Sequence, residues 1–176
     1  YGQTGQQDIL NDYPYMTTFT VSYPESCYQF GDKWYYTYRP NGYDSDIKWE
    51  TTTQTNLGFD FSLFDQTLYG SFDWFYKKTT DILVQMAGIA AMGEGSTQWI
   101  NAGEMENKGF ELNLGYRNTT AFGLKYDLNG NISAYRNKIT ALPATVAANG
   151  TFGGNGVESV IGHPNGAQVG YVADGI

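Results

Sequence analysis

The segment Thr55-Asn56-Leu57-Gly58-Phe59-Asp60-Phe61-Ser62-Leu63 alternates two kinds of side chain. From position 57 onward every odd position carries leucine or phenylalanine, and glycine, aspartate or serine stands between them. Successive side chains of a β-strand point to opposite faces, so a period of two predicts a strand with one apolar and one polar face. This segment therefore predicts a strand over about residues 53–63.

Three later segments carry the same period of two. In one of them Phe110, Leu112 and Leu114 alternate with Glu111 and Asn113. Within residues 55–63, 68–77, 109–116 and 124–135 the charged side chains fall on the polar face. We therefore expect an all-β chain whose antiparallel strands cover about residues 53–63, 67–77, 108–116 and 124–135.

The expected connections alternate between short and long. Phe64-Asp65-Gln66 joins the first two strands, and a polar turn around residues 117–120 joins the last two. Long loops are expected at about residues 10–50, 78–106 and 137–170. All tight turns then lie at one end of the sheet, as in outer-membrane β-barrels with short periplasmic turns and long extracellular loops. A β-sandwich gives no reason to sort its loops by length.

The apolar faces can be interpreted in two ways. In a transmembrane barrel they contact lipid, and the segments approach the nine to eleven residues that cross a bilayer when tilted. In a soluble carbohydrate-binding β-sandwich, with a tyrosine and tryptophan platform, they pack against a second sheet. A third interpretation, a secreted adhesive repeat, is disfavoured because no fixed repeat period is present. The barrel interpretation assigns nine side chains to the lipid-facing surface: Leu57, Phe59, Phe61, Phe72, Trp74, Phe110, Leu112, Leu114 and Leu128.

Composition excludes several other classes of protein. Among the 176 residues, 18 acidic and 10 basic side chains give a net charge of −8, which argues against a nucleic-acid partner. The aromatic share of 16% is too high for a disordered chain. No compactly apolar stretch approaches the 20 residues of a membrane helix.

Residue types that carry catalysis or bind metals are scarce. The chain has one histidine, His163, and one cysteine, Cys27. Nucleophilic catalysis needs a base beside the nucleophile, and zinc needs three or four ligands. Glu104 and Glu106 are close in the chain, but proximity in a Gly- and Asn-rich segment is poor support for a glycosidase pair. We predict no catalytic residue, no metal site and no cofactor.

Aromatic residues gather in the first long loop. Trp34, Tyr35, Tyr36 and Tyr38 lie within five positions, and Trp99 lies in the second long loop. Flat aromatic rings stack on the apolar faces of sugars, so these five residues are the candidate substrate-binding side chains. The alternative is that they pack the loops onto their neighbours, since exposed aromatic rows are costly.

Five motifs, in register across nearly the whole chain, resemble the TonB-dependent outer-membrane transporters of the SusC/RagA type. The strongest match is Asn101-Ala-Gly-Glu-Met-Glu-Asn-Lys-Gly-Phe-Glu111. The others are Tyr1-Gly-Gln-Thr-Gly-Gln-Gln-Asp8, Tyr38-Arg-Pro-Asn-Gly-Tyr43 followed by Ile47-Lys48-Trp49-Glu50-Thr51-Thr52-Thr53, Arg136-Asn-Lys-Ile-Thr-Ala-Leu-Pro143 and Gly170-Tyr-Val-Ala-Asp-Gly-Ile176.

The resemblance implies that residues 1–176 form part of a plugged, 22-stranded transmembrane β-barrel in the outer membrane of a Gram-negative cell. Such transporters import oligosaccharides, or in some cases peptides, and are driven by TonB. The implied partners are a SusD-like surface lipoprotein, outer-membrane lipid, and TonB itself, contacted through an N-terminal region outside these residues.

Overall fold

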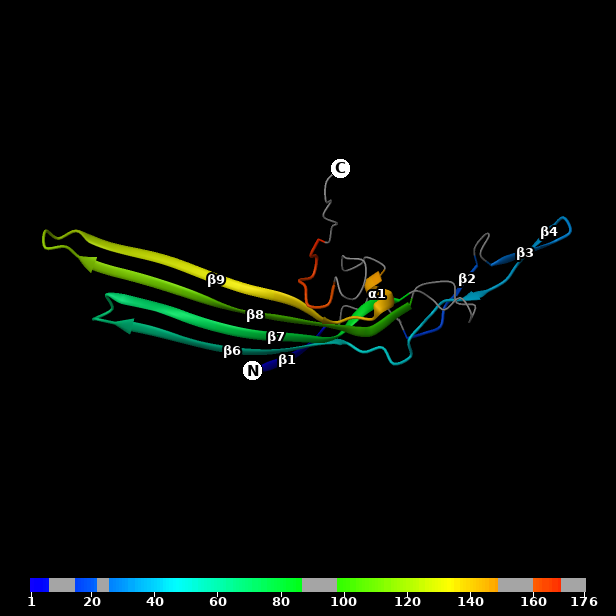
Figure 1. The fold of residues 1–176 in the computed structure, drawn as a ribbon, viewed down its shortest axis with the longest axis horizontal. Coiled ribbons are helices and arrows are strands. Elements are labelled where there is room, and N and C mark those ends of the chain that lie inside the picture. Colours follow the sequence, from blue (N-terminus) through cyan, green and yellow to red (C-terminus); the bar gives the residue numbers. More distant parts are fainter. Residues whose placement is uncertain (7–14, 22–25, 87–97, 149–159, 169–176) are drawn as a thin grey trace, which may run out of the picture.

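The computed structural model describes residues 1–6, 15–21, 26–86, 98–148 and 160–168. The motif at 170–176 and the last two residues of the motif at 1–8 lie outside the described residues. Figure 1 shows the described chain as one long sheet, with the smaller elements gathered toward one end.

The main sheet has five antiparallel strands in the order β1-β6-β7-β8-β9 (Figure 1). Their order follows the chain, so each of the long strands pairs with its sequence neighbour. Their bounds are β1 Gly2–Gln6, β6 Glu50–Leu63, β7 Leu68–Met86, β8 Gln98–Thr119 and β9 Lys125–Ala141. The four alternating segments of the sequence form the four long strands, and their antiparallel pairing agrees with the predicted class.

The strands extend well beyond their expected bounds at the end away from the tight turns. Strand β7 has 19 residues and β8 has 22, so much of the loop expected at 78–106 is strand. The predicted loop at 137–170 likewise begins with strand, since β9 continues to Ala141. These extensions lack alternating hydrophobicity, and the sequence pattern therefore could not reveal them.

Two tight turns close the long hairpins. Phe64, Asp65 and Gln66 have φ angles of 53°, 52° and 67° and, with Thr67, connect β6 to β7. The second turn lies at residues 120–124, where Gly123 has a φ of 92°. The turn expected around 117–120 is therefore misplaced, since β8 continues through Thr119.

Smaller elements lie near the opposite end. Two short hairpins pair β2 Phe19–Thr20 with β5 Arg39–Pro40, and β3 Cys27–Phe30 with β4 Lys33–Tyr36. Helix α1, Ala144–Ala148, follows β9 and contacts β7. No described helix is long and apolar enough to cross a membrane.

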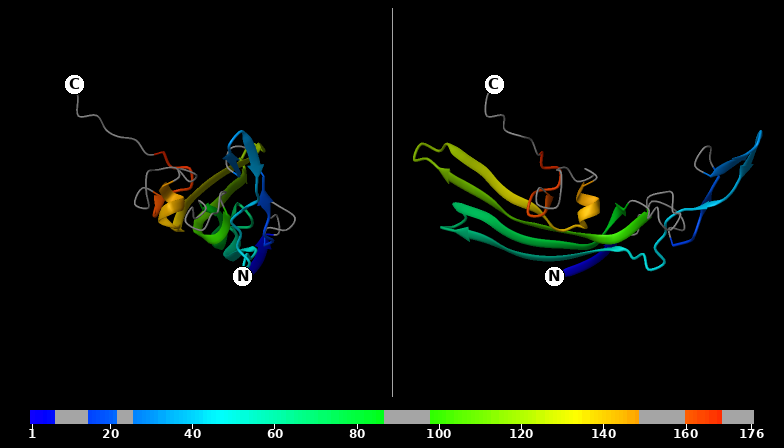
Figure 2. Two further views of the ribbon diagram at one scale, coloured as in Figure 1. Left: turned by 90° about the vertical axis from the view of Figure 1, so that its right-hand side faces the viewer. Right: turned by 45° about the vertical axis from the view of Figure 1, so that its right-hand side comes forward.

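The sheet is a single curved layer (Figure 2). Along the strand halves near the tight turns, large apolar side chains remain uncovered, with Leu57 66% and Leu128 64% exposed. No second sheet packs against these side chains in the described part of the chain. The sandwich interpretation required such a layer, so the single layer argues against it.

Candidate functional site: the two faces of the sheet

One face of the sheet carries continuous rows of apolar side chains. The register aligns Leu57 with Trp74 and Phe110 across three strands. The next row aligns Phe59, Phe72, Leu112 and Ile132, and ring centroids in it lie 5.6 Å apart for Phe59 and Phe72. Two further rows are Phe61, Gly70, Leu114 and Gly130, and Leu63, Leu68, Tyr116 and Leu128. We call these four rows the apolar band; it contains all nine side chains that the sequence assigned to lipid.

The opposite face carries polar side chains at the same level. One row aligns Asp60, Ser71, Asn113 and Asn131 across β6 to β9, and the Asn113 amide donates to the Ser71 hydroxyl. A hollow of about 640 Å³ lies over this row and its neighbours. Water or a hydrated solute can meet hydrogen-bonding groups along this face, as in the interior of transmembrane barrels.

Tyr69 organises the polar face beside the tight turns. Its hydroxyl lies 2.7 Å from both Asp127 Oδ1 and Asn129 Oδ1, and the Arg117 guanidinium lies 5.0 Å from its ring centroid. The ring covers Gly115, its direct partner on β8. A cross-strand aromatic that covers a glycine fixes register, because a side chain at the glycine would collide with the ring.

Two of the family-resembling motifs meet at one junction beyond the apolar band. The Asn101 carboxamide accepts a bond from Lys48 N–H at 2.6 Å and donates to Lys48 O at 2.9 Å. It also donates to Asp81 O at 2.7 Å. Nearby, Leu83 N–H donates to the Glu50 carboxylate at 3.0 Å. Side chains from β6 and β8 therefore hold β7 at this level.

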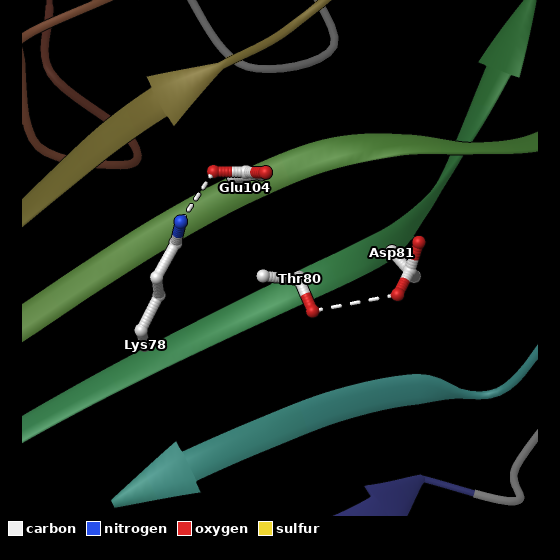
Figure 3. A network of polar contacts seen from close by, with 4 residues as sticks. All are labelled: Lys78, Thr80, Asp81 and Glu104. Carbon is white, nitrogen blue, oxygen red and sulfur yellow. Dashed lines mark hydrogen bonds and ion pairs between the residues drawn. The ribbon is translucent and has the colours of Figure 1, made fainter.

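The β7 backbone is irregular at this junction. Pairing with β8 shifts register between Thr79 and Ile82, and Asp81 has a φ of 57°. Aspartate tolerates this left-handed conformation better than most residues. Figure 3 shows Thr80 directed toward the Asp81 carboxylate, and Lys78 paired with Glu104 at 2.9 Å across the neighbouring strand. The sequence of β7 carried no sign of this bulge, because residues 79–82 contain no glycine; the glycine at the shift is Gly103, opposite Ile82 on β8.

The segment after β9 returns to the polar face of the sheet. Ile139 N–H donates to His163 O, and Gly162 N–H donates to Ile139 O, so this segment pairs with the edge of β9. Ile139 and Val160 are buried together, with exposures of 3% and 2%. Because Ile139 has the same orientation as the polar odd-numbered side chains of β9, the returning segment covers that face. His163 therefore takes part in this pairing through its backbone carbonyl.

The five candidate substrate-binding residues are not gathered into one site. Trp34, Tyr35 and Tyr36 lie on β4, where alternation places Tyr35 on one face and the other two on the opposite face. Tyr38 follows this hairpin and packs edge-to-face with Phe19, their centroids 6.4 Å apart. Trp99 lies on β8 of the main sheet, opposite Gln85, whereas β3 and β4 form a separate two-stranded sheet.

No metal-binding cluster occurs within the described ranges, where no three His, Cys, Asp or Glu side chains come together suitably. Glu104 pairs with Lys78, while Glu106 lies opposite Lys78 on the neighbouring strand. The two carboxylates therefore have structural partners.

Comparison with known proteins agrees with this geometry. The profile of the β-barrel of TonB-dependent receptor-like proteins matches residues 4–174. The chain belongs to this family. TonB-dependent receptors are transport proteins and not enzymes.

Its relatives include transporters of the SusC/RagA type. The chain is 32% identical to the TonB-dependent receptor SusC of Bacteroides thetaiotaomicron over 142 residues, which cover 81% of the chain and 14% of SusC. It is 38% identical over 100 residues to the TonB-dependent receptor P3 of Formosa agariphila, covering 57% of the chain and 10% of P3. The chain thus spans about a seventh or less of these TonB-dependent receptors.

Solved structures support the same fold. The RagAB peptide transporter superposes with a TM-score of 0.58 and 23% identity, covering 82% of this chain and 15% of that one. The RagAB peptide importer in its open-open state gives a TM-score of 0.61 and 24% identity, covering 80% and 14%. The sheet is therefore a part of a TonB-dependent receptor barrel.

Proposed function

We propose that this chain forms one side of a closed, 22-stranded barrel in an outer-membrane TonB-dependent importer. The observation that carries the proposal is the uncovered apolar band on one face of a single-layer sheet. Open sheet edges are not tolerated in hydrocarbon, because each unpaired backbone group costs several kcal/mol there. The two edges of this sheet would therefore be paired with neighbouring strands of the same barrel.

In this orientation the side chains of the apolar band, among them the nine that the sequence assigned to lipid, contact the outer-membrane lipid, and the polar face lines the barrel interior. The tight turns at 64–67 and 120–124 lie in the periplasm. The strand extensions and the β3–β4 hairpin lie on the extracellular side. The band has the one-sided pattern that transmembrane barrels require.

The imported substrate would be an oligosaccharide or a peptide. The resemblance to the SusC/RagA family implies this class of solute, and the similar RagAB structure is that of a peptide transporter. A SusD-like surface lipoprotein is the proposed extracellular partner, and TonB would act through a region outside this chain. Trp34, Tyr35, Tyr36, Tyr38 and Trp99 remain the proposed substrate-contacting aromatics, although they would have to act from separate positions.

Uptake in the cell of origin tests this function. The gene that encodes this chain would be deleted, and growth compared on defined oligosaccharides and on peptides as sole carbon sources. Restoration by the intact gene, but not in a strain lacking TonB, is the expected result. Equal growth of the deletion strain on every such substrate would contradict the importer assignment.

A tagged copy of the intact protein tests the partner separately. Purification in detergent is expected to recover a surface lipoprotein in about equal amount. Recovery of the barrel protein alone, under conditions in which it still restores growth, would contradict the proposed lid.

A further inference from the structure

Basic side chains gather directly beyond the apolar band, on the same face. The register aligns Thr55, Tyr76, Lys108 and Arg136 in the first row past Leu57 and Trp74, and Lys78, Glu106 and Lys138 in the next row. The pairing of these residues is regular, so they keep the orientation of the band. We call Lys78, Lys108, Arg136 and Lys138 the basic rim; it holds four of the ten basic residues of the chain.

The acidic side chains of the described residues neutralise the basic rim only in part. Lys108 and Arg136 are direct cross-strand partners, and like charges in that position destabilise a sheet. Lys78 pairs with Glu104 (Figure 3), and Glu106 lies directly opposite both Lys78 and Lys138 on the neighbouring strands.

Among the described residues, the remaining three cations form no ion pair. Lys108, Arg136 and Lys138 are exposed, and no carboxylate of the described residues lies within ion-pair distance of them. An anion from outside the protein would relieve the repulsion between Lys108 and Arg136.

The height of the basic rim matches the edge of a bilayer. Tyr126, whose ring lies 6.0 Å from that of Tyr116, marks the end of the band beside the tight turns. From Tyr126 to Arg136 the strand covers about 34 Å, or about 26 Å along the bilayer normal at a tilt near 40°. This rise is close to the apolar height of about 25 Å in outer-membrane barrels.

The two edges of the band differ in charge. Beside the tight turns, Arg117 lies opposite Asp127, and Lys125 lies opposite Thr119, all on the polar face. There the Arg117 guanidinium lies over the ring of Tyr69. Positive charge on the lipid-facing surface of the described residues therefore occurs at one edge only.

We propose that the basic rim binds the phosphate groups of a lipid headgroup in the extracellular leaflet. This inference rests on the membrane orientation proposed above. Guanidinium and ammonium groups form charge-assisted bonds with phosphate, and arginine can do so through two parallel bonds. Phosphate between Lys108 and Arg136 turns a repulsive pair into a shared site, and Lys138 lies one row further out to contact a second phosphate.

The test uses the intact barrel protein purified in a neutral detergent. Native mass spectrometry would measure the binding of lipid A carrying two phosphates, of lipid A without phosphates, and of phosphatidylcholine. We expect the phosphorylated lipid to bind at least tenfold more tightly than the other two. Equal binding of all three lipids would overturn the proposal, as would full displacement by millimolar inorganic phosphate, because the site would then be one for free anions.

Two matched double variants locate the site. Lys108→Gln with Arg136→Gln is expected to weaken binding of the phosphorylated lipid at least tenfold, while Lys77→Gln with Lys125→Gln, on the polar face, leaves it unchanged. The exchange Lys108→Arg with Arg136→Lys keeps both charges and is expected to retain binding. Equal losses from the two double-glutamine variants, each shown to be folded by its heat-modifiable migration in gels, would contradict the assignment.

Failure of this inference can be distinguished from failure of the proposed function. If nitroxide labels in the apolar band report contact with lipid but the phosphate-dependent binding is missing, only the basic rim proposal falls. If those labels report water, the membrane orientation falls, and the basic rim proposal falls with it.

Discussion

The Asn101 side chain binds both backbone polar groups of Lys48, at 2.6 Å and 2.9 Å, although the two residues are 53 positions apart. The same amide donates to Asp81 O at the bulge of β7. One carboxamide thereby ties the entry to β6, the irregular part of β7 and the start of the most family-like motif. Two motifs that looked separate in the sequence therefore form one structural junction.

Replacing Asn101 should loosen this junction. Asn101→Ala removes three hydrogen bonds, each contributing about 1 kcal/mol, so the local opening free energy should fall by about 1–3 kcal/mol. Hydrogen exchange of the Lys48 and Leu83 amides in the intact protein measures the effect. Asn113→Ala, which removes one exposed bond to Ser71, is the control and should leave these amides unchanged. Unaltered protection of Lys48 in Asn101→Ala would show that the amide does not hold the junction.

A charge in the apolar band should be costly. Leu112→Arg is expected to lower the free energy of unfolding in lipid by about 2–4 kcal/mol if the residue lies near the bilayer midplane. Asn113→Arg places the same side chain on the polar face and should cost much less. Equilibrium unfolding in urea, with the intact barrel in vesicles, compares the two. Equal costs would argue against a lipid-facing position for Leu112.

Glycine at position 115 should be required by the ring of Tyr69. A Cβ there would lie inside van der Waals contact distance of that ring and close to Asn129, so Gly115→Ala should destabilise the barrel by about 1–3 kcal/mol. Gly130→Ala is the matched control, because nothing lies within 4 Å of the added atom. Adding Tyr69→Ala should recover part of the loss. A Gly115→Ala barrel as stable as Gly130→Ala would contradict the register-fixing contact.

The aromatic side chains of the β3–β4 hairpin should affect substrate binding and not barrel stability. Trp34 and Tyr36 share one face of β4, so the double change to alanine should weaken binding of the imported solute several-fold. Tyr35→Ala alters the opposite face, where the ring packs on Phe30 with centroids 5.7 Å apart. Calorimetry with the solute found in the growth experiment measures both. Equal affinity of the Trp34/Tyr36 variant and the wild type would remove these residues from the candidate site.

The sequence predicted those parts of the sheet in which one face is apolar and the other is polar. Between Leu57 and Leu63, one face is apolar and the other polar, so the period of two marks the strand directly. Beyond the band, residues 50–55 are polar on both faces, and residues 101–108 are mostly polar on both faces. Alternation vanishes there although backbone pairing continues, and the strand ends were therefore missed by up to ten residues.

The candidate site was less predictable than the fold. Nearness in sequence suggested one aromatic platform at 34–38, but the alternation of β4 divides those rings between two faces. The bulge at Asp81 depends on contacts from β6 and β8, which no local pattern encodes. The basic rim likewise appears only when the register brings Lys108 and Arg136 side by side.

The central claim is that even-numbered side chains of β8 face the lipid hydrocarbon, while odd-numbered ones face the interior of a barrel. Nitroxide labels placed one at a time at Phe110 to Leu114 and at Tyr116, in the intact protein reconstituted in vesicles with Cys27→Ser, measure this by collision with oxygen and with a water-soluble nickel complex. Oxygen accessibility should peak at Phe110, Leu112, Leu114 and Tyr116, and nickel accessibility should be higher at Glu111 and Asn113. Uniform accessibility to nickel along the strand, or shielding of the even positions from both reagents, would contradict a lipid-facing band.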